Sequence, residues 1–290
     1  MGITREEVLR RLDLMCSAGG GVAAAKGKRA DPMSTAQVAV LASDVSAVHE
    51  LLRDRLPAVA AFLESEQQPD GRWQREGDDW HTSITGWVLL GLAATRTRSD
   101  LAVERGAAWL SARQTQDGGF AQSDTEEMPN TYSTSYATTG LAAVGGAARQ
   151  VSRGIGWLHG AQDREGGFGD DYSVVTGSDP SLTAYVAHAL NRLDDAAARV
   201  VVERCAGFIA ATQRPSGAWP AWYEDADSIE GTAACMRVLL AYPGLYSTQI
   251  TAGAAFLRRS VNITELENWI IVSLAYLYLK DPPHGLGKHG

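Results

Sequence analysis

Apolar residues recur along the chain with helical spacing, in segments of two alternating kinds. Segments of the first kind are rich in Ala, Leu and Val on most faces, as expected for an inner layer of helices. They run from Thr85 to Leu92, Ser135 to Val144, Thr183 to Leu193 and Thr232 to Tyr242. Segments of the second kind carry more charge, as in 98–105 and 194–204, and fit an outer layer. No segment of comparable length alternates like a strand, so the pattern predicts an all-α protein.

A motif with a glycine turn precedes each of these inner segments. Its first copy reads F-L-x-x-x-Q-x-x-D-G-x-W from Phe62 to Trp73, and weaker copies occupy 109–120, 157–168 and 208–219. The turn glycines recur about every 48 residues, which indicates stacked helical hairpins. Degenerate copies around Gly19-Gly20-Gly21 and after Phe256-Leu257 bring the number of hairpins to about six. We therefore expect one domain over residues 1–290, and a closed double ring of helices fits that number.

The motif resembles the Gln-Trp repeat of the terpene-cyclase and protein-prenyltransferase superfamily. The resemblance covers about 55–245 well and implies an (α/α)6 toroid whose inner helices surround a deep, apolar, aromatic-lined cavity. We interpret the Gln and the aromatic residue of each repeat as structural. The amide of such a Gln can bond backbone groups of the next helix, and the aromatic ring can pack across the turn.

One unit differs from the others at the start of its inner segment. Thr85, Ser135, Thr183 and Thr232 take equivalent places there. Two residues earlier stand Ser83, Ser133 and Ser181, which are common helix-capping residues, and in the fourth unit Glu230. A carboxylic acid in place of a small hydroxyl makes Glu230 the first candidate for chemistry.

The resemblance gives Glu230 a role. In class II terpene cyclases the middle Asp of D-x-D-D-T-A protonates an alkene or epoxide, and Thr232-Ala233 matches its T-A. Glu230 then takes the acid position, while Ser228 and Gly231 replace the outer acids; the V-x-D-C-T pattern of oxidosqualene cyclases also keeps only one acid. Asp225 and Asp227 form a D-x-D three residues too early and are the second candidates. As an alternative, Glu230 caps its own helix in a capping box.

A carbocation in the cavity would need stabilisation by aromatic faces. We therefore expect residues near the turns and the starts of the inner segments to bind substrate: Trp80, Trp87, Tyr136, Asp179, Tyr185, Trp222 and Trp269, with Tyr132, Tyr172 and Tyr223 as further aromatic candidates. Helix N-termini at the same end could hold a diphosphate.

Other functions remain open on the sequence. A protein prenyltransferase β-subunit resembles the chain in its Gly-Gly-Phe turns, but Asp179-Pro180-Ser181 lacks the Cys of that family's D-x-C zinc motif. A glycosidase on the same kind of toroid would need paired carboxylates, for which Asp78-Asp79, Asp170-Asp171, Asp179 and Glu230 are available. A non-catalytic isoprenoid-binding or accessory subunit is the third alternative.

The composition limits the classes of protein, the cellular locations and the cofactors that fit the chain. A net charge of −8 argues against a nucleic-acid binder, and three distant cysteines argue against a disulfide framework. The N-terminus has no apolar signal-peptide region, and no apolar stretch reaches about 18 residues, so we expect a cytoplasmic protein without a transmembrane segment. No dinucleotide fingerprint or D-D-x-x-D motif is present, so no cofactor or metal site is expected; Mg²⁺ would enter only with a diphosphate substrate.

The sequence thus predicts a class II terpene cyclase-like enzyme that uses a carboxylic acid, Glu230, as proton donor to a linear, apolar isoprenoid or prenyl diphosphate. Class II cyclases usually pair such a ring with a second helical domain. We therefore also expect a homodimer or a partner subunit that closes the cavity.

Overall fold

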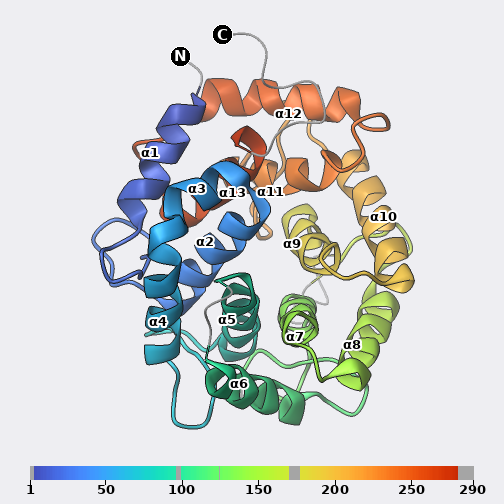
Figure 1. The fold of residues 1–290 in the computed structure, drawn as a ribbon. Helices are drawn as coiled ribbons and strands as arrows, with labels where there is room; N and C mark the ends of the chain where they lie inside the picture. The colour runs from blue at the N-terminus through green and yellow to red at the C-terminus, as the bar shows by residue number, and fades with distance from the viewer. Residues whose placement is uncertain (1–2, 96–98, 124, 170–176, 280–290) are drawn as a thin grey trace.

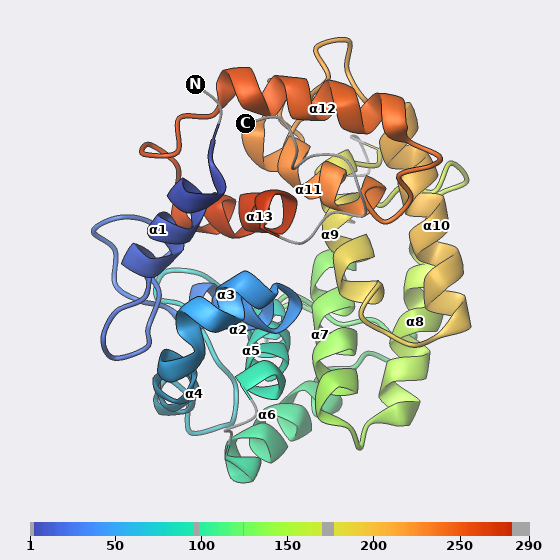
Figure 2. The same cartoon turned by 45° about the horizontal axis from the view of Figure 1, so that its top comes forward.

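Two concentric rings of helices make up the protein in the computed structural model, which describes residues 3–95, 99–123, 125–169 and 177–279. The inner ring consists of α2 (Pro32–Asp44), α5 (His81–Thr95), α7 (Thr131–Val144), α9 (Pro180–Leu190), α11 (Ile229–Leu239) and α13 (Asn268–Tyr278). The outer helices are α1 (Arg5–Met15), α3 (Ser46–Leu52) with α4 (Leu56–Ser65), α6 (Asp100–Arg113), α8 (Ala148–Ala161), α10 (Ala196–Ala211) and α12 (Ser247–Ser260). Both views show the outer helices flanking the inner ones (Figures 1 and 2). The predicted all-α (α/α)6 toroid is confirmed.

The ring closes because its last inner helix packs against both α11 and the first inner helix, α2. The side-chain amide of Asn268, at the start of α13, donates to the carbonyl of Ala23, 2.8 Å away, and its backbone N–H donates to Ala24, 2.9 Å away. These bonds join the last hairpin to the turn of the first. Within the described residues there are only isolated β-bridges, and no helix is long and apolar enough to cross a membrane.

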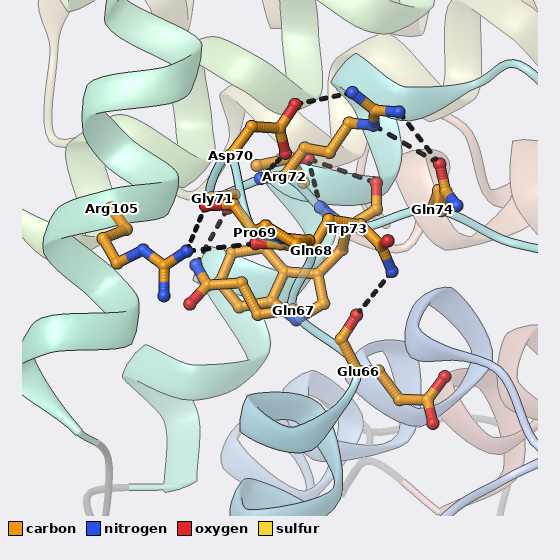
Figure 3. Close-up of polar contacts among 11 residues, drawn as sticks. Glu66, Gln67, Gln68, Pro69, Asp70, Gly71, Arg72, Trp73, Gln74 and Arg105 are labelled. Carbon is orange, nitrogen blue, oxygen red and sulfur yellow. Dashed lines mark hydrogen bonds and ion pairs between the residues drawn. The ribbon is translucent and has the colours of Figure 1, made fainter.

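The Gln of each repeat fixes its turn to the next outer helix, as Figure 3 shows for the first copy. The amide nitrogen of Gln67 donates to the carbonyls of Gly71 and Ala102, both at 2.8 Å. Gln114, Gln162 and Gln213 repeat the same pair of bonds at 2.8–3.0 Å. The fully buried Trp73 donates its indole N–H to the carbonyl of Leu63. The structural interpretation of these residues is therefore confirmed.

A threonine hydroxyl ties each turn to the inner helix that follows. It accepts the N–H of the turn residue at 2.9–3.1 Å in five repeats, through Thr35, Thr85, Thr134, Thr183 and Thr232. The expected equivalence of Ser135 with these threonines is wrong by one residue, because the loop before α7 is one residue shorter than the loop before α9: Thr134 follows Phe120 by 14 residues, and Thr183 follows Phe168 by 15. Thr134 is the equivalent residue, so Tyr132, and not Ser133, matches Glu230 in position.

Candidate active site

Glu230 is the second residue of α11, and it does not cap its own helix. Ser228 is the N-cap, and its hydroxyl accepts the N–H of Gly231 at 3.2 Å. The Glu230 carboxyl instead contacts neighbouring elements: the Tyr185 hydroxyl of α9 and the Trp222 indole N–H both donate to Oε1, each at 2.8 Å. The capping alternative is thus wrong, and Glu230 joins α11 to α9 and to the loop before α11.

Burial raises the pKa of Glu230 to about 7. The hydrogen bonds from Tyr185 and Trp222 lower the pKa, whereas the charges of Glu224 and Asp179 raise it. Desolvation thus outweighs both the two donors and the positive end of α11. Because Oε1 accepts two hydrogen bonds, a neutral Glu230 carries its proton on Oε2. Within the described residues, Oε2 has no hydrogen-bond partner.

Aromatic rings pack next to this carboxyl in a continuous group. Trp87, Tyr136 and Tyr185 each stand two residues after a repeat threonine, on α5, α7 and α9, and so occupy equivalent positions. Together with Trp80, Tyr132 and Trp222 they form what we name the aromatic cluster. Trp87 stacks on Tyr136 with centroids 4.3 Å apart, and Tyr185 stacks on Trp222 at 5.3 Å. Tyr132 touches Trp80, Tyr136, Tyr185 and Trp222, with centroids 4.8–6.0 Å apart, and so lies at the centre.

The loop before α11 brings Trp222 to this site with unusual backbone angles. Trp222 and the next residue, Tyr223, have φ values of +43° and +63°, and they are the two non-glycine residues with positive φ in the described chain. Their backbone N–H groups donate to the hydroxyl of Ser181 at 2.9 Å and to Oδ2 of Asp179 at 3.0 Å. Asp179 is the buried N-cap of α9.

Five of the predicted site residues belong to the aromatic cluster beside Glu230: Trp80, Trp87, Tyr136, Tyr185 and Trp222. A sixth, Asp179, binds the backbone of the loop that carries Trp222.

Three others lie apart from the site. Asp225 and Asp227 are exposed in the loop, where Arg214 pairs with the Asp227 carboxylate at 3.3 Å and donates to the Asp225 carbonyl. The Trp269 indole donates to Glu267 on the surface. Tyr172 and Asp170-Asp171 lie outside the described residues. Tyr132 was only a secondary candidate because the one-residue shift in α7 hid its equivalence to Glu230.

A cavity of about 1100 Å³ lies at the opposite end of the ring. All six inner helices line it near their C-terminal ends, with Asp44, His188, Arg192, Arg237 and Tyr276 among its polar residues. Glu230 does not line it. On α9, His188 lines the cavity and Tyr185, one turn earlier, binds Glu230, so the aromatic cluster separates the cavity from the carboxyl. In the described residues no three His, Cys, Asp or Glu side chains form a group that could hold a metal ion.

Residues 34–181, just over half of the chain, match the model of the squalene-hopene cyclase C-terminal domain. The chain belongs to this family. Residues 130–270, which include Glu230, match the prenyltransferase alpha-alpha toroid domain. No curated protein matches the chain.

Solved structures share the fold at low sequence identity. A protein from Actinoplanes is 20% identical, with a TM-score of 0.68, covering 89% of this chain and 81% of that one. The type II terpene cyclase MstE from Scytonema is 20% identical, with a TM-score of 0.64 and coverage of 89% and 79%. A GH76 α-mannanase from Bacteroides thetaiotaomicron is 12% identical, with a TM-score of 0.63 and coverage of 94% and 93%. Because a terpene cyclase and a mannanase both share it, the toroid alone does not identify the chemistry.

Proposed function

We propose that this family member is a class II terpene cyclase in which Glu230 protonates a C=C bond or an epoxide of a linear isoprenoid. The observation that carries the proposal is the environment of Glu230, a carboxyl with a pKa of about 7 that borders a cluster of six aromatic rings. A general acid works best when its pKa lies near the working pH. No cation pairs with this carboxyl in the described chain, so its neutral form persists near neutral pH.

In the proposed step the proton leaves Oε2 of Glu230 and bonds to the terminal alkene carbon. The electron pair of the double bond forms the new C–H bond and leaves a tertiary carbocation. The negative charge left on Glu230 is held by the Tyr185 hydroxyl and the Trp222 indole N–H, because both bonds strengthen when their acceptor becomes a carboxylate. Aromatic faces stabilise the cation, which the next double bond attacks to close a ring; the charge moves to the far carbon of that double bond, and loss of a proton from the neighbouring carbon to water gives the neutral cyclic product.

The reacting end of the substrate enters where the inner helices begin. Glu230, Trp80 and Trp222 are half-buried there, so the acid is accessible from that end. MstE provides a precedent for the substrate class, since its complexes hold geranylgeranyl dihydroxybenzoate as substrate and merosterolic acid A as product. We propose a polyprene or prenyl diphosphate for this protein, with Mg²⁺ only as the counterion of a diphosphate. We also propose a cytoplasmic location, and a second copy or a partner subunit that covers this end.

The test is to incubate the protein with linear prenyl diphosphates and free polyprenes and to analyse the extracts by mass spectrometry. We expect a cyclic product whose rate of formation falls as the pH rises through about 7, because Glu230 then loses its proton. Glu230→Gln should lower the rate at least about 100-fold while substrate binding persists. Asp227→Asn, in the exposed pair with Arg214, serves as the control and should keep the rate. Full activity of Glu230→Gln would refute the assignment, and substrate recovered unchanged from the wild type would favour the non-catalytic binder.

A further inference from the structure

The backbone at Trp222 and Tyr223 needs an external support. Two consecutive residues with side chains adopt left-handed angles there, which L-amino acids avoid because Cβ approaches the following carbonyl. No glycine or asparagine eases the turn. Such a conformation persists only where surrounding groups determine it, and the start of α9 provides those groups.

Asp179 and Ser181 bind both N–H groups of this left-handed turn. The Ser181 hydroxyl accepts the Trp222 N–H and donates to Oδ1 of Asp179 at 2.6 Å. The same Oδ1 caps α9 by accepting the Leu182 N–H at 2.7 Å, which leaves Oδ2 for the Tyr223 N–H. Asp179 is 3% exposed and Ser181 is fully buried, so water does not replace these bonds readily.

The turn determines where the Trp222 side chain lies. Its indole N–H reaches Oε1 of Glu230 at 2.8 Å, and its ring stacks at 20° on Tyr185, which is the other donor to Glu230. Both donors to the carboxyl therefore depend on one turn. Moving the turn would free the indole, unstack Tyr185 and admit water to the acid.

We propose that Asp179 and Ser181 are positioning residues for Glu230, which hold the left-handed turn and, through it, the Trp222 indole on the carboxyl. The inference rests on the proposed function in taking Glu230 as the acid, but the contacts themselves do not depend on that role. It also changes the prediction for Asp179: its carboxylate accepts hydrogen bonds from Ser181, Leu182 and Tyr223, so we assign it to support of the turn and not to substrate binding. The charge of Asp179 further helps to keep Glu230 protonated.

The chain contains a matched control for Asp179. Asp31-Pro32-x-x-Thr35-Ala36 has the same pattern as Asp179-Pro180-x-x-Thr183-Ala184. Asp31 is likewise a buried N-cap, and it accepts the Ser34 N–H at 2.9 Å. In the described chain it makes no bond to a left-handed turn. Asp31→Asn therefore removes a buried N-cap carboxyl group, as Asp179→Asn does, but leaves the bonds that hold the turn at Trp222 and Tyr223 in place.

The first experiment compares Asp179→Asn with Asp31→Asn by two measurements that need no substrate. One is the NMR signal of the Trp222 indole N–H, assigned by its loss in Trp222→Phe. The other is the infrared band of the protonated Glu230 carboxyl, assigned by its loss in Glu230→Gln and followed from pH 5 to 9. The titratable groups facing Glu230 are Asp179 and Tyr185, Glu224 of the loop, and Tyr132 of α7.

We expect Asp179→Asn to move the indole signal to its position in free tryptophan. The midpoint of the Glu230 titration should fall by at least about one pH unit, because hydration of the acid and loss of the Asp179 charge both lower its pKa and together outweigh the loss of the Trp222 hydrogen bond, which by itself would raise it. Cyclisation should slow at least tenfold. Asp31→Asn should leave all three readouts at wild-type values.

Ser181→Ala separates support from charge, because it removes a hydroxyl and retains the carboxyl group of Asp179. It should move the indole signal in the same direction, whereas Ser133→Ala, at a buried hydroxyl that has no hydrogen-bond partner among the described residues, should not. Ser181→Ala also tests the proposal if Asp179→Asn does not fold. Wild-type indole and infrared signals in both Asp179→Asn and Ser181→Ala would overturn it. If no variant or wild-type protein cyclises a substrate but the signals move, the proposed function fails and the positioning role stands.

Discussion

Burial acts on two carboxyl groups of the ring with opposite outcomes. It raises the pKa of Glu230 to about 7, where the partners are a neutral hydroxyl and a neutral indole. At Asp44 burial also opposes ionisation, but the hydrogen bonds and charge of Arg192, with the Tyr276 hydroxyl, hold the pKa below its usual value. The presence of a cation therefore decides between them: it keeps Asp44 ionised, whereas Glu230, which pairs with no cation in the described chain, favours the neutral form that our proposal requires of a proton donor.

The raised pKa of Glu230 predicts how stability depends on pH. The folded state binds this proton more tightly than the unfolded state, whose pKa is near 4.5. The stabilisation is therefore fully present below about pH 4.5 and is lost as the pH rises through about 7, by about 3 kcal/mol in all. Urea unfolding of the wild type and of Glu230→Gln at pH 4.5–8 measures it, since the variant should lack this part of the pH dependence. Parallel pH profiles of the two proteins would contradict the prediction.

At the scale of the elements, the repeat Gln connects a turn to the next outer helix. Gln67→Leu should destabilise the protein by about 2 kcal/mol, because the carbonyls of Gly71 and Ala102 lose their donor. The neighbouring Gln68 provides the control, since its side chain makes one long bond of 3.3 Å, and Gln68→Leu should cost below about 0.5 kcal/mol. Chemical denaturation of the two variants checks the difference. Equal losses would show that the Gln67 bonds are not what joins the hairpins.

How far the sequence predicts these elements depends on whether a signal repeats. The Gln, Gly and aromatic positions recur in four copies, so the hairpins and the toroid follow from the sequence. Loop lengths do not recur, and because the loop before α7 is one residue shorter than the loop before α9, Ser135 was expected in place of Thr134 and the equivalence of Tyr132 to Glu230 was hidden. Arg105, Arg153 and Arg204 also recur and donate to turn carbonyls of the preceding repeat, a signal that the aromatic motif overshadowed.

The candidate site was predictable only in part. Glu230 stood out because it broke the repeat, and three of its aromatic neighbours follow from their place two residues after a threonine. The left-handed turn at Trp222 was not predictable, since neither of its residues favours that conformation. The bond from Asp179 to this turn could not be predicted for the same reason, because it is a tertiary contact with no local sequence pattern.

At the scale of the whole molecule, an ion pair joins inner helices at the end of the ring opposite to Glu230. Arg192, just after α9, bonds both carboxylate oxygens of Asp44, at the end of α2, at 2.6 and 3.0 Å. These two helices lie three places apart in the ring of six (Figure 1), so the ion pair links opposite sides of the inner ring. The Tyr276 hydroxyl of α13 also donates to Asp44, at 2.8 Å, and the Arg237 guanidinium lies over the Tyr276 ring. Four inner helices thus meet at one polar cluster.

The Arg192–Asp44 ion pair should contribute far more to the free energy of unfolding than an ordinary surface ion pair. Arg192→Met leaves a mostly buried Asp44 charge with two neutral donors, the Tyr276 and Ser43 hydroxyls, and should cost about 3 kcal/mol. Arg199→Met breaks an ion pair of similar length, 2.9 Å, whose side chains are 64% and 99% exposed, and should cost below about 1 kcal/mol. Adding Asp44→Asn to Arg192→Met should cost less than the sum of the single changes, by about 1–3 kcal/mol, because the second change removes the stranded charge. Urea unfolding of the wild type and these variants completes the cycle. Additive losses, or an Arg192→Met cost no larger than that of Arg199→Met, would mean that the ring closes through its apolar packing and the α13 contacts alone.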